Sequence, residues 1–415
     1  MNESQTHFDV IVIGGGASGM MAAGTAAHNG KRVLLLEKNA HLGEKLKITG
    51  GGRCNITNAE YDTHALLKNY GKAAPFLYSP FSQFGIKDTF AFFESHKLPL
   101  VVQARKRAFP ITEKAPDVVK VFEKYLKDGE VSVKTNARIT KILTEGNSIV
   151  GVVAKGTTYK AKSYILATGG MSHPETGSTG DGFGWLKDLG HTIWEPTPTI
   201  VPLAVSDKWI KSLSGTSLSF MKITFSVDGV KKFSKTGKLL FTHFGLSGPL
   251  ILNSAAKVAD LLHIGQVTAT IDAYPDTDHA SLDEKILNIF EENKNRMLKN
   301  IFDKIAPHGT AFAILSLITD IPNDTKVHSI TKDARKRIVG LLKSLPVTIT
   351  GLMGFDRAVV ADGGIQLEEI DMKTMRSKKI QNLHVTGDLL NINRPSGGYS
   401  LQLCWTTGYI AGKSV

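Results

Sequence analysis

The N-terminal forty residues contain the feature that most limits the folds open to this chain. A short apolar, β-branched run, FDVIVI at residues 8–13, predicts a buried strand. The stretch GGGASG follows at residues 14–19, and residues 20–30 read as a helix that stops near Gly30. A second apolar run, KRVLLLEK, ends at the acidic Glu37 and its neighbour. Strand, glycine turn, helix, strand and acidic residue in this order predict a Rossmann-type βαβ unit.

The spacing of these glycines predicts a dinucleotide site. Gly14 permits a tight turn, Gly16 lets a pyrophosphate approach the backbone, and Gly19 lets the helix pack on the strand. The phosphates then lie at the helix N-terminus, where unpaired N–H groups and the helix dipole favour anions. We expect Glu37 to accept hydrogen bonds from the adenosine ribose, and an acidic group there disfavours a 2′-phosphate at this site. The motif therefore predicts NAD or FAD.

The stretch KLKITGGGRCNITN at residues 45–58 helps to decide between NAD and FAD. Three consecutive glycines, at residues 50–52, lie between Lys45 and the Arg53–Asn55 triplet. Triple glycine costs backbone entropy on folding, so it indicates a close approach or a positive φ angle. A plain NAD domain continues directly into further βα units, whereas this loop suits an extended ligand whose oxygens meet backbone amides. The loop favours FAD.

Later glycine clusters extend the same interpretation. Gly169 and its neighbour follow a predicted strand, and the end of an earlier strand near Arg138 is placed to reach the adenine edge. The strand at 382–386 ends in Gly387–Asp388, which we expect to bind ribityl hydroxyls. A glycine pair at 397–398 then opens an apolar helix, whose N–H groups can point at the flavin N1–C2 edge.

Composition restricts the class of protein. The chain has 415 residues, of which 42% are hydrophobic and 21% charged, as in a globular protein of two or three domains. No apolar run reaches the roughly 18 residues of a membrane span, and the first ten residues predict no signal peptide. The two cysteines, far apart in sequence, exclude a disulfide scaffold and a cysteine metal cluster, so we expect no metal site and a cytoplasmic location.

The net charge of +12 leaves the partners partly open. It fits a basic surface in solvent, and it also fits a nucleic acid or an anionic ligand. Lysines are spread along the chain without a dense block, and no RNA-binding signature occurs, so the first reading is favoured. We expect a small-molecule substrate and neither a membrane nor a nucleic-acid partner, and the oligomeric state stays open.

The middle of the chain changes character. Strand patterns run from about residue 195 to 275, including residues 238–252, with a hairpin signal in VDGVKK. Helical spacing then covers residues 281–305 and two later segments, which Pro346 closes. The predicted organisation is an FAD-binding domain (1–194), a β-rich middle domain (195–275), a helical insert (276–345) and a return to the FAD-binding domain (346–415).

The sequence resembles the BaiN-type flavoprotein family, also described as NAD(P)/FAD-dependent oxidoreductases or aminoacetone-oxidase-family FAD-binding enzymes. The resemblance spans nearly the whole chain. It is carried by GGGASGM, KLKITGGGRCNITN, ATGGMSHPETGSTGDGFG, FTHFGLSGPLIL, VVADGGIQLEEIDMKTMRSKKIQNLHVTGD and SGGYSLQL. It implies an α/β, glutathione-reductase-like (Rossmann-type) FAD domain made from both chain ends, with an inserted β-barrel-like domain and a helical insert.

The motifs and the resemblance together give a set of expected cofactor contacts. These are Gly14, Gly16, Ala17, Ser18, Gly19, Glu37, Lys38, Glu44, Lys45, Gly50, Gly51, Gly52, Arg53, Cys54, Asn55, Arg138, Gly169, Gly387, Asp388, Gly398, Tyr399, Ser400 and Leu401. For Cys54 a packing role is favoured over a redox thiol, because it has no CxxC partner. No catalytic residue is assigned.

The chain departs from the family pattern near the flavin ring. The family has Gly-Glu at the position of Gly387–Asp388, an aspartate where this chain has Asn391 and Asn393, and asparagine at the position of Ser400.

The expected function is an FAD-dependent oxidoreductase acting on a small organic substrate in a cleft over the flavin. Amine or aminoketone oxidation and ketone or enone reduction both remain open, and so does NAD(P)H as a transient reductant. An RNA-acting flavoprotein and a flavin-binding module without turnover are the alternatives.

Overall fold

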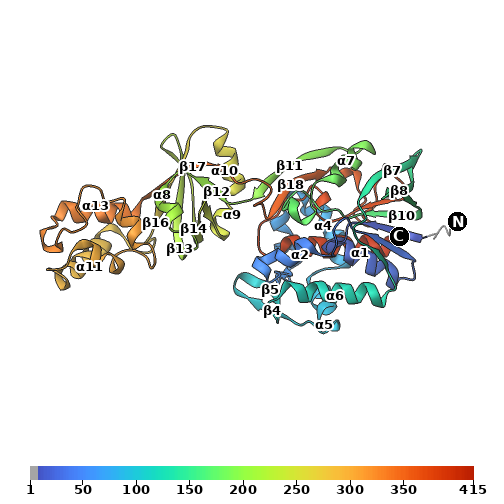
Figure 1. Ribbon diagram of the computed structural model, residues 1–415, viewed down its shortest axis with the longest axis horizontal. Helices are drawn as coiled ribbons and strands as arrows, with labels where there is room; N and C mark the ends of the chain where they lie inside the picture. The colour runs from blue at the N-terminus through green and yellow to red at the C-terminus, as the bar shows by residue number, and fades with distance from the viewer. Residues whose placement is uncertain (1–7) are drawn as a thin grey trace. The chain divides into compact units, whose positions relative to one another are not determined.

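A parallel sheet of five strands, to which both ends of the chain contribute, forms the core of one part of the protein; its strand β10 (Ala161–Leu166) is labelled in Figure 1. Its order is β19 (Leu383–Val385), β10, β1 (Phe8–Ile13), β2 (Val33–Leu36) and β6 (Ser132–Lys134). The apolar runs of β1 and β2 are almost fully buried, as expected where both faces of a parallel sheet are covered. The helix α1 (Ala17–His28) follows β1 directly, which confirms the predicted Rossmann-type unit.

The two ends of the chain meet in this sheet and in one helix pair. The C-terminal helix α14 (Tyr399–Ser414) packs along α1. Two glycines of α14 make the close contact possible, since a Cβ added at Gly408 would lie 2.4 Å from the Ser18 carbonyl oxygen, and one at Gly412 would lie 2.3 Å from that of Ala22. The FAD-domain fold expected from both chain ends is therefore confirmed.

Smaller elements surround this core. They are the sheet β3 (Thr57–Asn58), β5 (Arg107–Pro110) and β4 (Leu100–Gln103), the sheet β7 (Ile139–Glu145), β8 (Ser148–Ala154) and β9 (Thr157–Tyr159), the pair β11 (Ile193–Ile200) and β18 (Val360–Ile365), and the helices α2 (Glu44–Ile48), α3 (Thr63–Leu67), α4 (Ala74–Gln83), α5 (Ile86–Ser95), α6 (Ala115–Asp128) and α7 (Asp181–Asp188).

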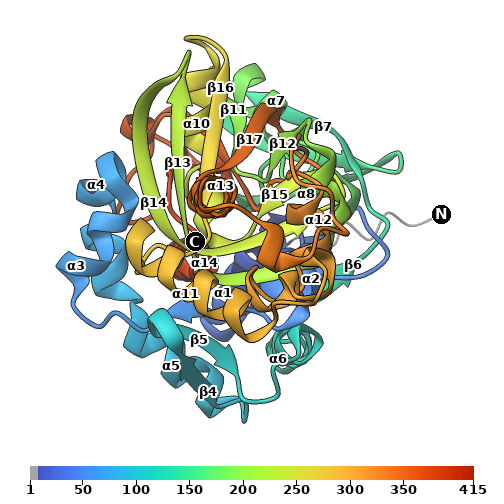
Figure 2. The same ribbon diagram turned by 90° about the vertical axis from the view of Figure 1, so that its left-hand side faces the viewer.

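A closed antiparallel barrel forms the core of the middle of the chain. Its strands, in their order in the barrel, are β12 (Leu203–Val205), β15 (Gly245–Ser247), β14 (Val230–Thr242), β13 (Ser217–Val227), β16 (Val267–Asp272) and β17 (Leu345–Leu352). Strands β13, β14 and β16 lie side by side (Figure 2). The hairpin between β13 and β14 turns at Asp228 and Gly229, both with positive φ (50° and 80°), as the predicted Asp-Gly turn requires.

Several helices belong to the same part of the chain as the barrel strands. They are α8 (Lys208–Ser212), α9 (Pro249–Leu252), α10 (Ala255–Leu262), α11 (His279–Glu292), α12 (Ala311–Leu315) and α13 (Lys332–Lys343). Two sequence expectations are wrong here. The strand predicted at residues 238–252 ends as α9, because Pro249 suits a first helical turn. The helix predicted at 281–305 ends at Glu292 and continues as 3₁₀ turns, because polar residues 293–296 interrupt the apolar stripe.

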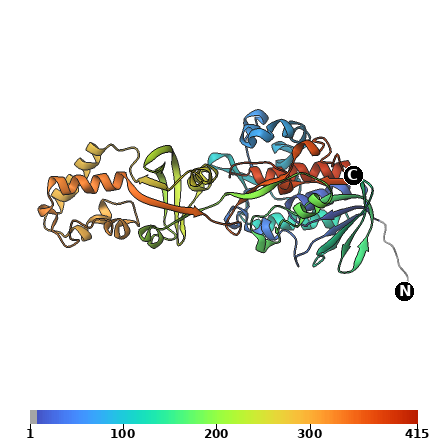
Figure 3. The ribbon, with the colours of Figure 1, turned by 90° about the horizontal axis from the view of Figure 1, so that it is seen from above.

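The structure, a computed structural model, describes residues 8–415 and divides into two units. Among these residues, unit 1 comprises 8–198 and 359–415, and unit 2 comprises 199–358. The expected return to the FAD-binding domain at residue 346 is therefore too early. Pro346 does follow the last helix of unit 2, but it lies within β17, the orange strand that follows α13 in Figure 3. Strand β17 pairs with β12 and β16 and closes the barrel. The expected β-rich domain and helical insert belong to the same unit.

The helices of the described residues include none long and apolar enough to cross a bilayer. The prediction about a signal peptide concerns the first ten residues, most of which lie outside the described part of the chain.

Candidate active site

The glycine turn between β1 and α1 combines a tight backbone with an open approach. Gly14 has φ +105°, and a Cβ added there would lie 2.5 Å from the Ala167 carbonyl oxygen. A Cβ on Gly19 would lie 1.8 Å from the Gly14 carbonyl oxygen, so the helix starts directly against the turn. A Cβ on Gly16, in contrast, meets no atom within 4 Å. The space over Gly16 is the space that a pyrophosphate needs.

The N-terminus of α1 provides hydrogen-bond donors for an anion. Gly16 is its N-cap residue and no side chain caps the helix, so Ala17 and Ser18 begin the helix with N–H groups that have no partner within it. The first turn contains no acidic residue. This combination of uncapped N–H groups and a positive dipole end favours phosphate.

Glu37 lies immediately after β2 and is buried, with 7% of its surface exposed. Its Oε2 accepts a hydrogen bond from the Gly15 N–H at 2.6 Å, and its Oε1 accepts one from the Asn39 N–H at 2.7 Å. A carboxylate has further lone pairs, so these bonds orient Glu37 without using up its capacity for ribose hydroxyls. The neighbouring Lys38 pairs with Asp181 at 2.9 Å.

The triple-glycine loop has the conformation that only glycine adopts easily. Gly50, Gly51 and Gly52 have φ angles of 60°, 68° and 85°. A Cβ on Gly50 would lie 2.9 Å from the Asn55 amide nitrogen, whereas Gly51 and Gly52 face open space. Burial raises the pKa of the Cys54 thiol to about 12, so this cysteine packs inside the protein as a neutral thiol.

The residues after the loop hold neighbouring backbone in place. With its amide oriented to satisfy its neighbours, Asn55 accepts a hydrogen bond from the Gly398 N–H at 2.9 Å and donates to the Thr57 carbonyl at 3.1 Å. The Arg53 guanidinium stacks on the Phe109 ring at 4.4 Å. These contacts make Asn55 a link between the glycine loop and the start of α14.

A charged cluster forms where β19 ends. Asp388 accepts a hydrogen bond from Arg394 through Oδ1, and its Oδ2 lies 3.4 Å from Lys45 Nζ. Lys45 also donates to Ser172 Oγ at 3.1 Å. Burial acts to raise the pKa of Asp388, but the charges of Arg394 and Lys45 outweigh it and hold this pKa below its ordinary value. The cluster thus contains two cations and one carboxylate.

Sequence reasoning missed Arg394. Its side chain is almost fully buried, donates to the Ile392 carbonyl at 2.7 Å, and donates through Nε to Ser400 Oγ at 3.1 Å. It connects two positions that depart from the family pattern, Asp388 and Ser400. The available signal was an arginine within a short apolar and glycine-rich segment, where a charge needs a partner.

The start of α14 lies against β3. Gly398 has φ +102°, and a Cβ there would lie 2.3 Å from the Thr57 carbonyl carbon. The N-terminus of this 16-residue helix has no side-chain cap. The Tyr399 carbonyl accepts a hydrogen bond from the buried Tyr70 hydroxyl at 2.9 Å, and Leu401 is buried.

Two further glycines lie beside these groups. A Cβ on Gly387 would lie 2.8 Å from Ser18 Oγ, which places the end of β19 next to the start of α1. A Cβ on Gly169 would lie 3.9 Å from Lys45 Nζ. The structure therefore brings together residues from both ends of the chain at the carboxyl ends of parallel strands, where ligands of such folds bind.

The remaining expected contacts are less centrally placed. Arg138 is exposed, with its guanidinium 3.8 Å from Asp181, and Glu44 pairs with Lys47 at 2.7 Å. The cofactor roles of all these residues stay predictions, but the open glycines, the uncapped helix ends and the buried charges fit FAD.

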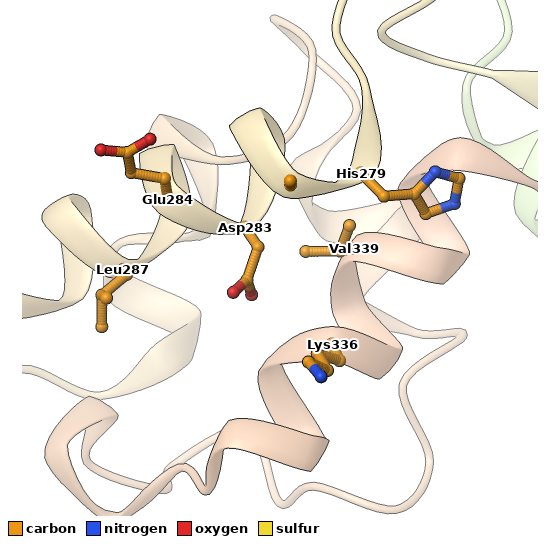
Figure 4. Close-up of a pocket in the computed structure, with 7 residues that line it drawn as sticks. His279, Asp283, Glu284, Leu287, Lys336 and Val339 are labelled. Atoms are coloured by element: carbon orange, nitrogen blue, oxygen red, sulfur yellow. The ribbon is translucent and has the colours of Figure 1, made fainter.

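A separate cleft of about 500 Å³ occurs in unit 2 between α11 and α13 (Figure 4). It is lined by His279, Ala280, Asp283, Glu284, Leu287, Lys336 and Val339. It has no glycine turn or strand end, and Asp283 is already bound by Arg335 through two hydrogen bonds of 2.8 and 2.9 Å. We assign no cofactor to this cleft.

Comparison with known proteins places the chain in a family. The family model described as HI0933-like protein Rossmann domain matches residues 8–414. A 3-dehydro-bile acid delta(4,6)-reductase from Clostridium scindens is 28% identical over 97% of this chain and 98% of its own length. A ribosomal RNA dihydrouridine synthase from Haemophilus influenzae is 27% identical over 98% of each chain.

Solved structures agree on the fold. The 3-ketosteroid-delta4-(5alpha)-dehydrogenase of Rhodococcus jostii RHA1 has a TM-score of 0.55 at 15% identity, covering 100% of this chain and 98% of its own. The family match covers nearly all described residues, in agreement with the resemblance expected from the motifs. The chain therefore belongs to the HI0933-like Rossmann family of FAD-binding proteins, and it is an FAD-dependent oxidoreductase.

Proposed function

We propose that the enzyme is a reductase that saturates a carbon–carbon double bond conjugated with a carbonyl group. The observation that carries this proposal is the chemistry shared by two full-length relatives. The names bile acid delta(4,6)-reductase and dihydrouridine synthase both describe addition of hydrogen to such a bond, in a steroid ring and in a uracil ring. Because these two relatives are named for one type of reaction on two unlike substrates, they support the reaction type more strongly than they support either substrate.

The reaction adds a hydride and a proton across the double bond. FAD, when bound in its reduced form, would supply the hydride, and solvent would supply the proton; we propose NAD(P)H as the reductant that returns the oxidised flavin to its reduced form. The chain positions the cofactor through the α1 N-terminus and the open glycines of its loops. Near the start of α14, the two positive charges of Arg394 and Lys45 outnumber the single negative charge of Asp388. Such a surplus favours the anionic form of a reduced cofactor over its neutral oxidised form.

A small cyclic enone is the leading substrate class, and a uridine within RNA is the second candidate. The second candidate is supported by the H. influenzae relative and by the net charge of +12. Amine or aminoketone oxidation, which the sequence left open, has no support from the relatives named here.

The test uses FAD-loaded protein reduced under anaerobic conditions. Mixed with a steroid 4-en-3-one or with a uridine-containing RNA, it should return to the oxidised visible spectrum and yield the saturated product. A saturated ketone of the same ring size is the control and should leave the flavin reduced. Oxidation by the saturated ketone, or reduction of the oxidised enzyme by a primary amine, would replace the proposal with carbonyl reduction or amine oxidation.

A further inference from the structure

The small sheet beside the glycine loop presents a row of polar side chains on one face. In this sheet β5 lies between β3 and β4, and Arg107 is paired with Asn58 on one side and Gln103 on the other. Residues directly opposite each other on neighbouring strands point to the same face, as do alternate residues within a strand. Phe109, two residues after Arg107, is thus on this face as well.

This face is turned toward the candidate active site. The Asn58 side chain donates to the Gly397 carbonyl at 3.1 Å, immediately before the start of α14. On the same face Phe109 lies under the Arg53 guanidinium, and a Cβ on Gly50 would lie 3.6 Å from the Phe109 ring. Arg107 is therefore on the side of the sheet that meets both the triple-glycine loop and the glycine pair of α14.

Cations gather on and around this face in excess of carboxylates. Arg53 pairs with Glu113 at 3.3 Å, and Lys106 pairs with Glu60. Arg105 and Arg107, in contrast, form no ion pair or side-chain hydrogen bond within residues 8–415. The exposed Arg105 lies in the turn and Arg107 is half-buried.

Without a bound anion, the surroundings of the Arg107 guanidinium disfavour its positive charge. Burial lowers the pKa of Arg107, and the positive charges of Arg105 and Arg53 lower it further. The turn that carries Arg105 also has an unusual backbone, because Arg105 and Lys106 both have positive φ (61° and 57°) without being glycine. Strained conformations of this kind concentrate at functional sites.

We propose that Arg107, assisted by Arg105, binds a phosphate group at the rim of the flavin site. A guanidinium binds phosphate through two parallel hydrogen bonds, and a phosphate would relieve the repulsion between neighbouring arginines. The phosphate has two possible sources, the nucleotide reductant and an RNA substrate. The inference rests on the proposed function for these sources, and it adds a binding site that the reaction type does not require.

Binding to protein loaded with oxidised FAD is measured by titration calorimetry with three probes: inorganic phosphate, NADP⁺ (which has the phosphates of NADPH but cannot reduce the flavin), and a short uridine oligonucleotide. The variant Arg107→Gln removes the positive charge and the paired N–H donors of the guanidinium. It should lower the affinity for at least one phosphate-bearing probe by roughly tenfold or more. Arg107→Lys keeps the charge and should restore part of the affinity. A loss of affinity for the oligonucleotide identifies RNA as the source of the phosphate, and a loss of affinity for NADP⁺ identifies the nucleotide reductant.

Arg32→Gln is the matched control. Arg32 is an exposed arginine beside Asp9 at the opposite end of the parallel strands, and its loss should leave all three affinities unchanged. Failure of the wild type to bind any probe, equal affinities in wild type and Arg107→Gln, or equal losses in Arg107→Gln and Arg32→Gln would each overturn the proposal.

Folding and function are separated within the same experiment. Because the Arg107 side chain makes no hydrogen bond within the described residues, Arg107→Gln should keep its FAD content and melting temperature. If it does not fold, Arg107→Lys and Arg105→Gln, compared with Arg32→Gln, decide the question in the same way. Calorimetry needs no turnover, so absence of enone reduction would count against the proposed function and leave the phosphate site standing.

Discussion

Asp388 and Arg394 form a buried ion pair between residues only six positions apart in the chain. Lys45, from the opposite end of the sequence, lies on the other oxygen of the same carboxylate. The carboxylate predicted to bind ribityl hydroxyls is thus held by two cations, and Arg394 extends the network to Ser400 at the start of α14. We therefore expect stability and cofactor binding to be coupled at this position.

Substituting Asp388 should reveal this coupling. Asp388→Asn leaves Arg394 and Lys45 without a counter-charge, and loss of one partner of a buried pair costs about 3–5 kcal/mol of stability. The variant should therefore melt at a lower temperature and bind FAD more weakly.

The double variant Asp388→Asn/Arg394→Gln distinguishes the two effects. It removes the uncompensated guanidinium, so the melting temperature should recover in part. FAD affinity, measured by equilibrium dialysis, should stay low if Asp388 contacts the cofactor directly. Full recovery of FAD affinity in the double variant would show that Asp388 has only a structural role.

Gly16→Val should abolish FAD binding without unfolding the protein. A Cβ at Gly16 meets no protein atom, and the φ of −81° suits any residue, so the valine fits the protein but occupies the place of the pyrophosphate. Gly340→Val in α13 is the matched control, because a Cβ there also meets no atom within 4 Å. Both variants are compared by flavin absorbance and thermal unfolding, and a yellow Gly16→Val protein would contradict the nucleotide-loop assignment.

Acid should destabilise the protein through Glu369. Burial acts to raise its pKa, but hydrogen bonds from Lys379, His191 and Thr192 outweigh this and lower the pKa from 4.5 to about 2. A carboxylate with a lowered folded-state pKa stabilises the fold above its unfolded pKa, and this contribution disappears as the pH falls from 4.5 toward 2.

Glu369→Gln should therefore lower stability near neutral pH and flatten the loss of stability between these pH values. Urea unfolding at several pH values measures both effects. Glu195→Gln, at an exposed carboxylate paired with Lys187, is the control and should leave the profile unchanged. An identical acid profile for wild type and Glu369→Gln would show that this network adds no stability.

Both cysteines should be unreactive in the folded protein. Burial raises the pKa values of Cys54 and Cys404 to about 12, so almost no thiolate is present at neutral pH. A chromogenic disulfide reagent should detect neither thiol in the native protein and both after unfolding in guanidinium. Rapid reaction of Cys54 in the native state would instead support a redox role for this residue.

Binding of NAD(P)H should be weak and sensitive to salt. The barrel strands of unit 2 pair antiparallel, so residues 199–358 contain no second unit made of a parallel strand, a glycine turn and a helix. The net charge of +12 attracts phosphates, and salt screens this attraction. Anaerobic stopped flow of FAD-loaded protein with NADH and NADPH at two salt concentrations measures flavin reduction, and micromolar, salt-independent saturation would reveal a dedicated nicotinamide site.

The sequence by itself determined the N-terminal βαβ unit, its glycine turn and the later glycine clusters. These features depend on local chemistry, because alternation, positive φ and helix starts are decided within a few residues. The strand patterns also predicted a β-rich domain in the middle of the chain, and only the family resemblance implied that it is barrel-like. The last barrel strand, β17, was missed because Pro346 marks the end of a helix as well as the edge of a strand.

Only the tertiary structure decided which distant residues share the site. Arg394 reads in the sequence as one charge among many, and its significance comes from burial against Asp388 and Lys45. Arg107 likewise became a candidate only when strand pairing placed it opposite Asn58, on the face that meets Gly397. Burial and the absence of a counter-charge are properties of packed neighbours from distant parts of the chain, and no local sequence pattern encodes them.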